Sequence, residues 1–66
     1  MKYLINKEQV PPIVFKTSIE TSMEILYGDV WVDSMKNIHI NYILDNLRRN
    51  EIELCINHIC YQIEGD

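Results

Sequence analysis

The sequence has no long hydrophobic run and few side chains that carry chemistry. Its 66 residues include two histidines, two cysteines and one tryptophan, and no apolar stretch approaches the length of a membrane-spanning helix. The apolar start over residues 1–5 is interrupted by polar residues from Asn6 onward, too early for a signal peptide. We therefore expect a cytoplasmic protein whose two cysteines stay reduced.

Positive charge is also scarce, with six basic residues against ten acidic ones and a net charge of −4 at pH 7. Nucleic acids and anionic membranes attract Lys and Arg, so this balance disfavours both and suits a basic protein partner. Lys36, Arg48 and Arg49 form the one basic cluster near a predicted helix, and Asp45 and Glu51 offset it. Nucleic-acid binding through this cluster, doubled in a dimer, remains an alternative function.

The shortness of the chain allows one domain over residues 1–66 and no second core. An apolar content of 47% is ordinary for a folded protein, but a domain of this size buries only about 60% of its unfolded surface. Such domains are commonly completed by a partner subunit. We therefore expect a homodimer or larger oligomer.

The chain has only two prolines and two glycines, and those in its first half are Pro11, Pro12 and Gly28. Residues 2–5 and 13–15 are predicted as short strands, joined through an extended connection at Pro11-Pro12. Residues 18–27 are predicted as a helix, because Thr17 and Glu20 fit a capping box.

The segment after this helix is predicted as a strand over residues 30–32. The competing interpretation is a hairpin over residues 24–33 with a turn at Gly28-Asp29. Its register sets Glu24 opposite Asp33, and this like-charge pair disfavours the hairpin.

The second half gives clearer patterns. Residues 37–49 carry Ile40, Ile43, Leu44 and Leu47 at helical spacing. Polar and apolar residues alternate over 51–56 and again over 59–64, which predicts a hairpin around Asn57-His58.

In this register Ile56 faces Ile59, Leu54 faces Tyr61, and Cys55 faces Cys60. We predict an α+β fold: a small antiparallel sheet with a C-terminal β-hairpin packed on one main helix. The predicted core comprises Leu4, Val14, Ile25, Val32, Ile40, Ile43, Leu44, Leu47, Ile52, Leu54, Ile56, Ile59, Tyr61 and Ile63.

Cys55 and Cys60 allow three interpretations. The favoured one is a pair of small apolar residues on a partly covered sheet face. A disulfide, or a metal site with His58 and His39, remains an alternative, although the spacing matches no standard zinc pattern. We predict no metal and no cofactor.

No catalytic constellation is visible. His39 and His58 have no accompanying motif and are expected at ordinary exposed positions. The carboxylates of Glu20, Glu24 and Glu53 are expected on solvated faces. We therefore do not expect an enzyme.

Trp31 lies between Asp29 and Asp33, and Glu24 precedes this segment. We favour a core role for Trp31, because the chain has little other core volume. The alternative is an interface anchor in which Trp31, Asp29, Asp33 and Glu24 select a basic partner.

These features together favour a small protein-binding inhibitor or adaptor that occludes a larger partner. The chain is small, acidic and rich in Ile, Asn and Glu, and in these respects it resembles the accessory proteins of phages and mobile elements. This analogy of type assigns a role to no residue. Sequestration of a small molecule between protomers is a further alternative.

Overall fold

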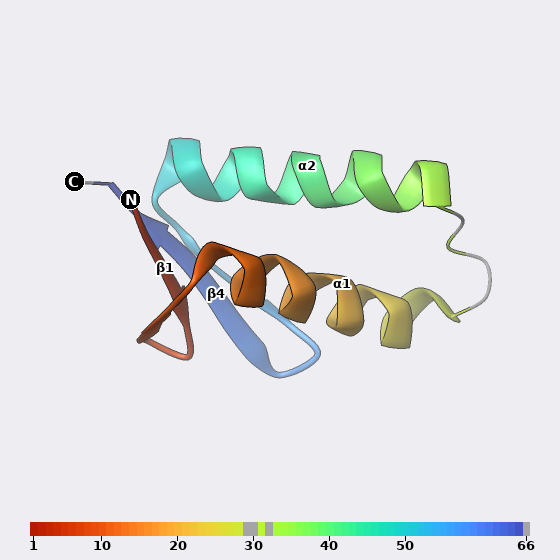
Figure 1. The fold of residues 1–66 in the computed structure, drawn as a ribbon, viewed down its shortest axis with the longest axis horizontal. Helices are drawn as coiled ribbons and strands as arrows, with labels where there is room; N and C mark the ends of the chain where they lie inside the picture. Colours follow the sequence, from red (N-terminus) through yellow and green to blue (C-terminus); the bar gives the residue numbers. More distant parts are fainter. Residues whose placement is uncertain (29–30, 32, 66) are drawn as a thin grey trace.

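Two β-hairpins flank a pair of helices in the chain (Figure 1). The computed structural model describes residues 1–28, 31 and 33–65, without the side chains of Asp33 and Ser34. The elements in order are β1 (Lys2–Ile5), β2 (Glu8–Val10), α1 (Pro12–Tyr27), α2 (Asp33–Asn50), β3 (Glu53–Ile56) and β4 (Ile59–Glu64). The α+β class is therefore confirmed. Among the described residues, no helix is long and apolar enough to cross a membrane.

The four strands form one antiparallel sheet in the order β2-β1-β4-β3. The first and last strands lie side by side at its centre, where Tyr3 pairs with Ile63 and Ile5 with Tyr61. The C-terminal hairpin has the predicted register, including Cys55 opposite Cys60. β3 begins at Glu53, two residues later than predicted, whereas β4 spans the predicted residues 59–64.

Both hairpins turn on two residues with positive φ. These are Asn6 and Lys7 (φ 49° and 69°) between β1 and β2, and Asn57 and His58 (φ 52° and 66°) between β3 and β4. Two positive φ values are the signature of a type I′ turn, whose twist matches that of paired strands. Asn favours the first position because it tolerates the left-handed conformation.

The strand predicted over residues 13–15 is wrong, because these residues form the first turn of α1. Pro12 occupies the start of the helix, where its missing N–H costs nothing and its fixed φ is already helical. The predicted helix over 18–27 is the rest of α1, and the alternative hairpin is excluded over 24–27.

Gly28 ends the helix at φ 62° and donates its N–H to the Glu24 carbonyl. The strand predicted over 30–32 lies outside the described residues at 30 and 32.

A second helix replaces the predicted single main helix, since α1 and α2 both pack on the sheet. α2 is longer than the predicted segment 37–49, and Glu51 follows it at φ 49°. Every second side chain along a strand points toward these helices, as Tyr61 and Ile63 do in β4. The opposite face carries Leu4, Cys60 and the polar neighbours of Leu4.

The core lies between the helices and this one sheet face. Its members are Phe15, Ile19, Met23, Trp31, Ile40, Leu44, Leu47, Ile56, Tyr61 and Ile63, with Ile43 and Ile59 partly buried against them. The predicted set left out Phe15, because residue 15 was assigned to a strand. It also left out Ile19 and Met23, because Ile25 was taken as the core residue of the helix predicted over 18–27. Trp31 was favoured for the core without being placed in the predicted set.

Four predicted core residues are exposed. Val14 and Ile25 lie off the buried face of α1, which runs through Phe15, Ile19, Ser22 and Met23. Ile52 and Leu54 were expected on the same face as Tyr61. Leu54 lies in the edge strand β3 and Ile52 just before it, while α2 packs mainly over β4, so both stay exposed. Leu4 is buried, but on the opposite face, and Val32 lies outside the described residues.

Candidate functional site

The Trp31 side chain is buried, in agreement with the favoured interpretation. Its indole N–H donates to His39 Nδ1 at 2.9 Å, and its ring stacks on Tyr27 with centroids 5.9 Å apart. The Lys36 ammonium lies 5.8 Å from the centre of the indole ring. These contacts join the end of α1 to the beginning of α2.

The acids predicted around Trp31 are only partly described. Glu24 is exposed and forms an ion pair with Lys36. Asp33 begins α2, although its side chain is outside the described part, and Asp29 is outside it altogether. Trp31 itself is buried, so a partner site that combines it with these acids stays a prediction.

The two histidines differ from each other. His58 is exposed in the hairpin turn, as expected. His39 was expected to be exposed and is half-buried, because its Nδ1 accepts the indole hydrogen bond. With Nδ1 accepting, the neutral ring carries its proton on Nε2. This histidine therefore has a structural partner that its position near a helix start did not reveal.

The three basic residues of the alternative nucleic-acid site do not form one patch. Lys36 pairs across the helices with Glu20 and Glu24, and Arg49 pairs with Asp45 at 3.2 Å. Arg48 lies twelve residues after Lys36, about 18 Å along a helix. The carboxylates beside Lys36 and Arg49 reduce the attraction of each for phosphate.

A buried hydroxyl cluster joins the sheet to α1. Tyr61 Oη lies 2.7 Å from Ser18 Oγ and 2.8 Å from Ser22 Oγ. Two serines four residues apart on a helix share a face and reach the same phenol. This cluster was not predicted from the sequence, where its signal is the four-residue spacing of Ser18 and Ser22 together with a predicted core tyrosine.

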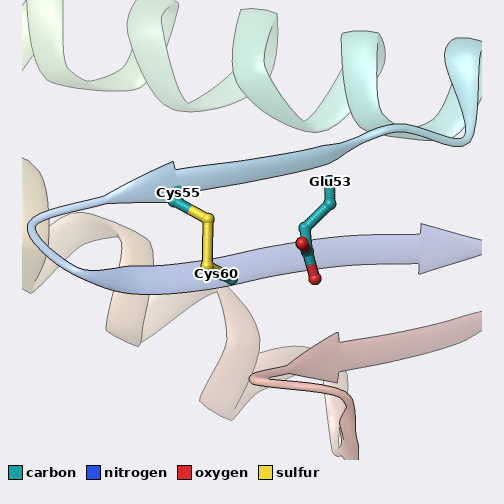
Figure 2. Close-up of side chains that lie close together, drawn as sticks. All are labelled: Glu53, Cys55 and Cys60. Carbon is teal, nitrogen blue, oxygen red and sulfur yellow. A yellow bond between two sulfur atoms is a disulfide. The ribbon is translucent and has the colours of Figure 1, made fainter.

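Cys55 and Cys60 are bonded to each other, so the expectation that they stay reduced is wrong for this structure. Their sulfurs lie on the sheet face opposite the helices, and Glu53 lies beside them (Figure 2). The ligand atoms of Glu53, Cys55 and Cys60 all lie within 4.8 Å of one another. Neither histidine belongs to this group in the described part of the chain.

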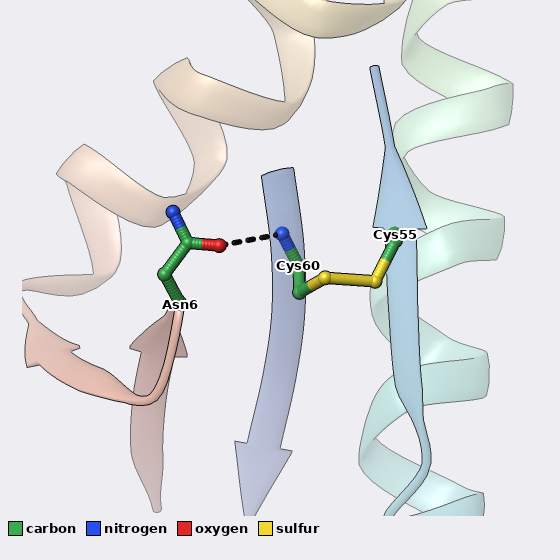
Figure 3. The surroundings of a disulfide bond; sticks show 3 residues. All are labelled: Asn6, Cys55 and Cys60. Atoms are coloured by element: carbon green, nitrogen blue, oxygen red, sulfur yellow. Dashed lines mark hydrogen bonds between the residues drawn. A yellow bond between two sulfur atoms is a disulfide. The ribbon is translucent and has the colours of Figure 1, made fainter. Parts of the chain in front are cut away.

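The first hairpin turn holds Cys60 in place (Figure 3). The Cys60 N–H donates to Asn6 Oδ1 at 3.0 Å, and the Asn6 N–H donates to the Cys60 carbonyl at 2.8 Å. One turn residue therefore satisfies both backbone groups of the cysteine on the central strand.

An exposed apolar surface runs from the outer side of α2 to the edge strand. We name it the α2–β3 strip and define it as Ile38, Tyr42, Ile43, Ile52 and Leu54. Tyr42 and Ile38 are 71% and 67% exposed, and Ile52 is 48% exposed. A groove of about 210 Å³ lies within the strip, lined by Tyr42, Ile43, Asn46, Ile52 and Leu54.

A second groove adjoins the first. It is lined by Met23, Tyr27, His39, Tyr42 and Ile43, so Tyr42 and Ile43 belong to both grooves. The strip therefore continues along α2 to the residues that enclose Trp31. Comparison with protein-family models, curated proteins and solved structures found no match to this chain.

Proposed function

We propose that this chain is a protein-binding inhibitor or adaptor that covers part of a larger partner through the α2–β3 strip. The strip's exposed apolar side chains are the observation that carries the proposal. Tyr42 and Ile38 lie one helical turn apart on the outer side of α2, away from the buried Ile40. Contiguous apolar surface of this kind commonly marks a protein interaction site.

The edge strand adds a second means of binding. β3 pairs with β4 on one side, and in the described residues no strand pairs with its other side. An extended partner segment can add to such an edge through main-chain hydrogen bonds. The other edge is a poorer docking strand, because β2 has three residues and Pro11 follows it.

Charge defines the chemistry of the partner. The chain carries −4, and the exposed Glu51 lies next to Ile52 at the end of the strip. An apolar partner face with basic residues at its rim fits this surface best. The second groove is lined by Tyr27 and His39, which both contact the buried Trp31, so the partner site predicted from sequence would adjoin the far end of the same surface.

The test is affinity capture with the purified chain, comparing Tyr42→Asp with Ile13→Asp. Both residues are highly exposed on helices, but Ile13 lies on α1 beside Val14 and Thr17, outside the strip. We expect a partner that the wild-type chain and Ile13→Asp capture equally and that Tyr42→Asp loses at least about tenfold, as for a central aromatic contact. Equal capture by all three proteins, or no captured protein, contradicts the proposal.

The cytoplasmic location predicted from sequence belongs to the same proposal. Disulfides are uncommon in the cytoplasm, where dithiol reductants keep thiols reduced. Cys55 is exposed and Cys60 half-buried, so a reductant can reach their bond. In that compartment the chain would work in its reduced form.

A further inference from the structure

We propose that, in the reduced chain, Cys55, Cys60 and Glu53 bind one soft divalent metal ion, with Zn²⁺ as the first candidate. Their ligand atoms already lie within 4.8 Å of one another on one face of the sheet. Two thiolates and a carboxylate are donors that zinc takes in proteins. The site lies on the opposite sheet face from the α2–β3 strip, so the inference does not rest on the proposed function.

The two thiols stay together after reduction because the fold holds their backbones. Cys55 and Cys60 are direct partners across β3 and β4, and the type I′ turn between them fixes this register. Both hydrogen bonds between Asn6 and Cys60 are independent of the disulfide. The bond also lies outside the core, whose residues in this hairpin are Ile56, Tyr61 and Ile63 on the other face.

The donor set suits a four-coordinate ion. Zinc binds thiolate sulfur at about 2.3 Å, which places two sulfurs of a tetrahedral site about 3.8 Å apart. Once the covalent bond is broken, rotation about the two Cα–Cβ bonds can separate the sulfurs. Glu53 precedes Cys55 by two residues, so its side chain leaves β3 on the same face. Water completes the fourth position, so we expect weaker binding than in a site with four cysteines.

The chemistry makes the metal and the disulfide mutually exclusive. A dithiol reductant breaks the Cys55–Cys60 bond, becomes a disulfide itself, and leaves one proton on each cysteine sulfur. A phosphine reductant becomes a phosphine oxide with oxygen from water, and leaves the same two thiols. Zn²⁺ then displaces both thiol protons, and Glu53 binds it through a side-chain oxygen.

The experiment titrates Zn²⁺ alone into the chain after phosphine reduction, and into the oxidised chain. We expect one Zn²⁺ per reduced chain, two protons released in weak buffer, and no binding to the oxidised chain. Co²⁺ in place of Zn²⁺ reports thiolate ligation through its sulfur charge-transfer absorption. Equal binding by both forms, or no binding by the reduced form, overturns the proposal.

Two carboxylate variants test the third ligand. Glu53→Gln should weaken binding by at least about tenfold, since even outer-shell partners of a metal are worth that much. Glu64→Gln is the matched control, because Glu64 lies on the same sheet face but outside the cluster, and should bind as the wild type does. Equal effects of the two substitutions contradict a role for Glu53.

A double variant tests whether the site is preformed. Cys55→Ser with Cys60→Ser should retain the far-UV circular dichroism of the wild type and bind no Zn²⁺. An unfolded variant overturns the proposal, because the fold would then depend on the disulfide.

Discussion

The phenol of Tyr61 connects the central strand β4 to α1 through two serine hydroxyls. The ring is fully buried, and it packs edge-on against Phe15 with centroids 5.5 Å apart. Ser22 is also buried, at 1% exposure, so its hydroxyl depends on a protein partner. A buried hydroxyl without a partner is costly, which makes this cluster important for stability.

Tyr61→Phe should lower the free energy of unfolding by about 1–2 kcal/mol, because the ring volume is kept while Ser22 loses its partner. Urea denaturation followed by far-UV circular dichroism measures this change. Tyr42→Phe is the control and should be neutral, since the Tyr42 side chain is mostly exposed. A loss below about 0.5 kcal/mol for Tyr61→Phe would show that the Ser22 hydroxyl finds another hydrogen-bond partner.

At the scale of elements, the two hairpins use one turn design with one difference. Asn6 and Asn57 both occupy the first turn position at nearly equal φ. The Asn6 side chain reaches the neighbouring strand, where its Oδ1 accepts the N–H of Cys60. Among the hydrogen bonds of the described residues, the Asn57 side chain makes no such contact. The first turn therefore braces the second hairpin as well as closing its own.

Asn6→Ala should cost about 0.5–1 kcal/mol more unfolding free energy than Asn57→Ala. Both substitutions place alanine in the left-handed region, so that cost cancels in the comparison. The remaining difference is the hydrogen bond to Cys60, which contributes about that amount. Thermal unfolding of the two variants measures it, and equal midpoints would rule out the bracing role of Asn6.

The sequence predicted the C-terminal hairpin because alternation, turn and register all agree over residues 51–64. The first hairpin has the same Ile-Asn start to its turn, but Glu8-Gln9-Val10 carries no alternation to reveal β2. The start of α1 was missed for a physical reason. Pro11-Pro12 was interpreted as an extended connection, although proline is favoured at the first helical position, which Pro12 occupies.

Contacts between distant segments were beyond sequence reasoning. Leu54 lies on the helix side of the sheet as predicted, and Ile52 lines a groove beside α2. No pattern along the chain indicates that α2 packs mainly over β4 or that β3 lies at the edge. The hydrogen bond between Trp31 and His39 likewise depends on how the helices meet. The α2–β3 strip is the result of this packing, so it was visible only in three dimensions.

At the scale of the whole molecule, two helices cover one face of a four-stranded sheet and leave much apolar surface outside. Eleven large hydrophobic side chains among the described residues are exposed. A domain of this size has too little interior to bury all of them. Several of these side chains lie beside an unpaired strand edge in the α2–β3 strip. Association with another molecule can bury the apolar surface that folding leaves exposed there.

A second copy of the chain is the occupant we expect for the strip when no partner is present. Pairing of β3 with β3 of another copy would extend the sheet and bring two strips together. We therefore expect a dimer by light scattering at tens of micromolar, with a Tm that rises with protein concentration. Tyr42→Asp should give a monomer whose Tm is independent of concentration, while Ile13→Asp should remain dimeric. A wild-type monomer under these conditions would exclude self-association through the strip, and the capture experiment would still test binding of another protein.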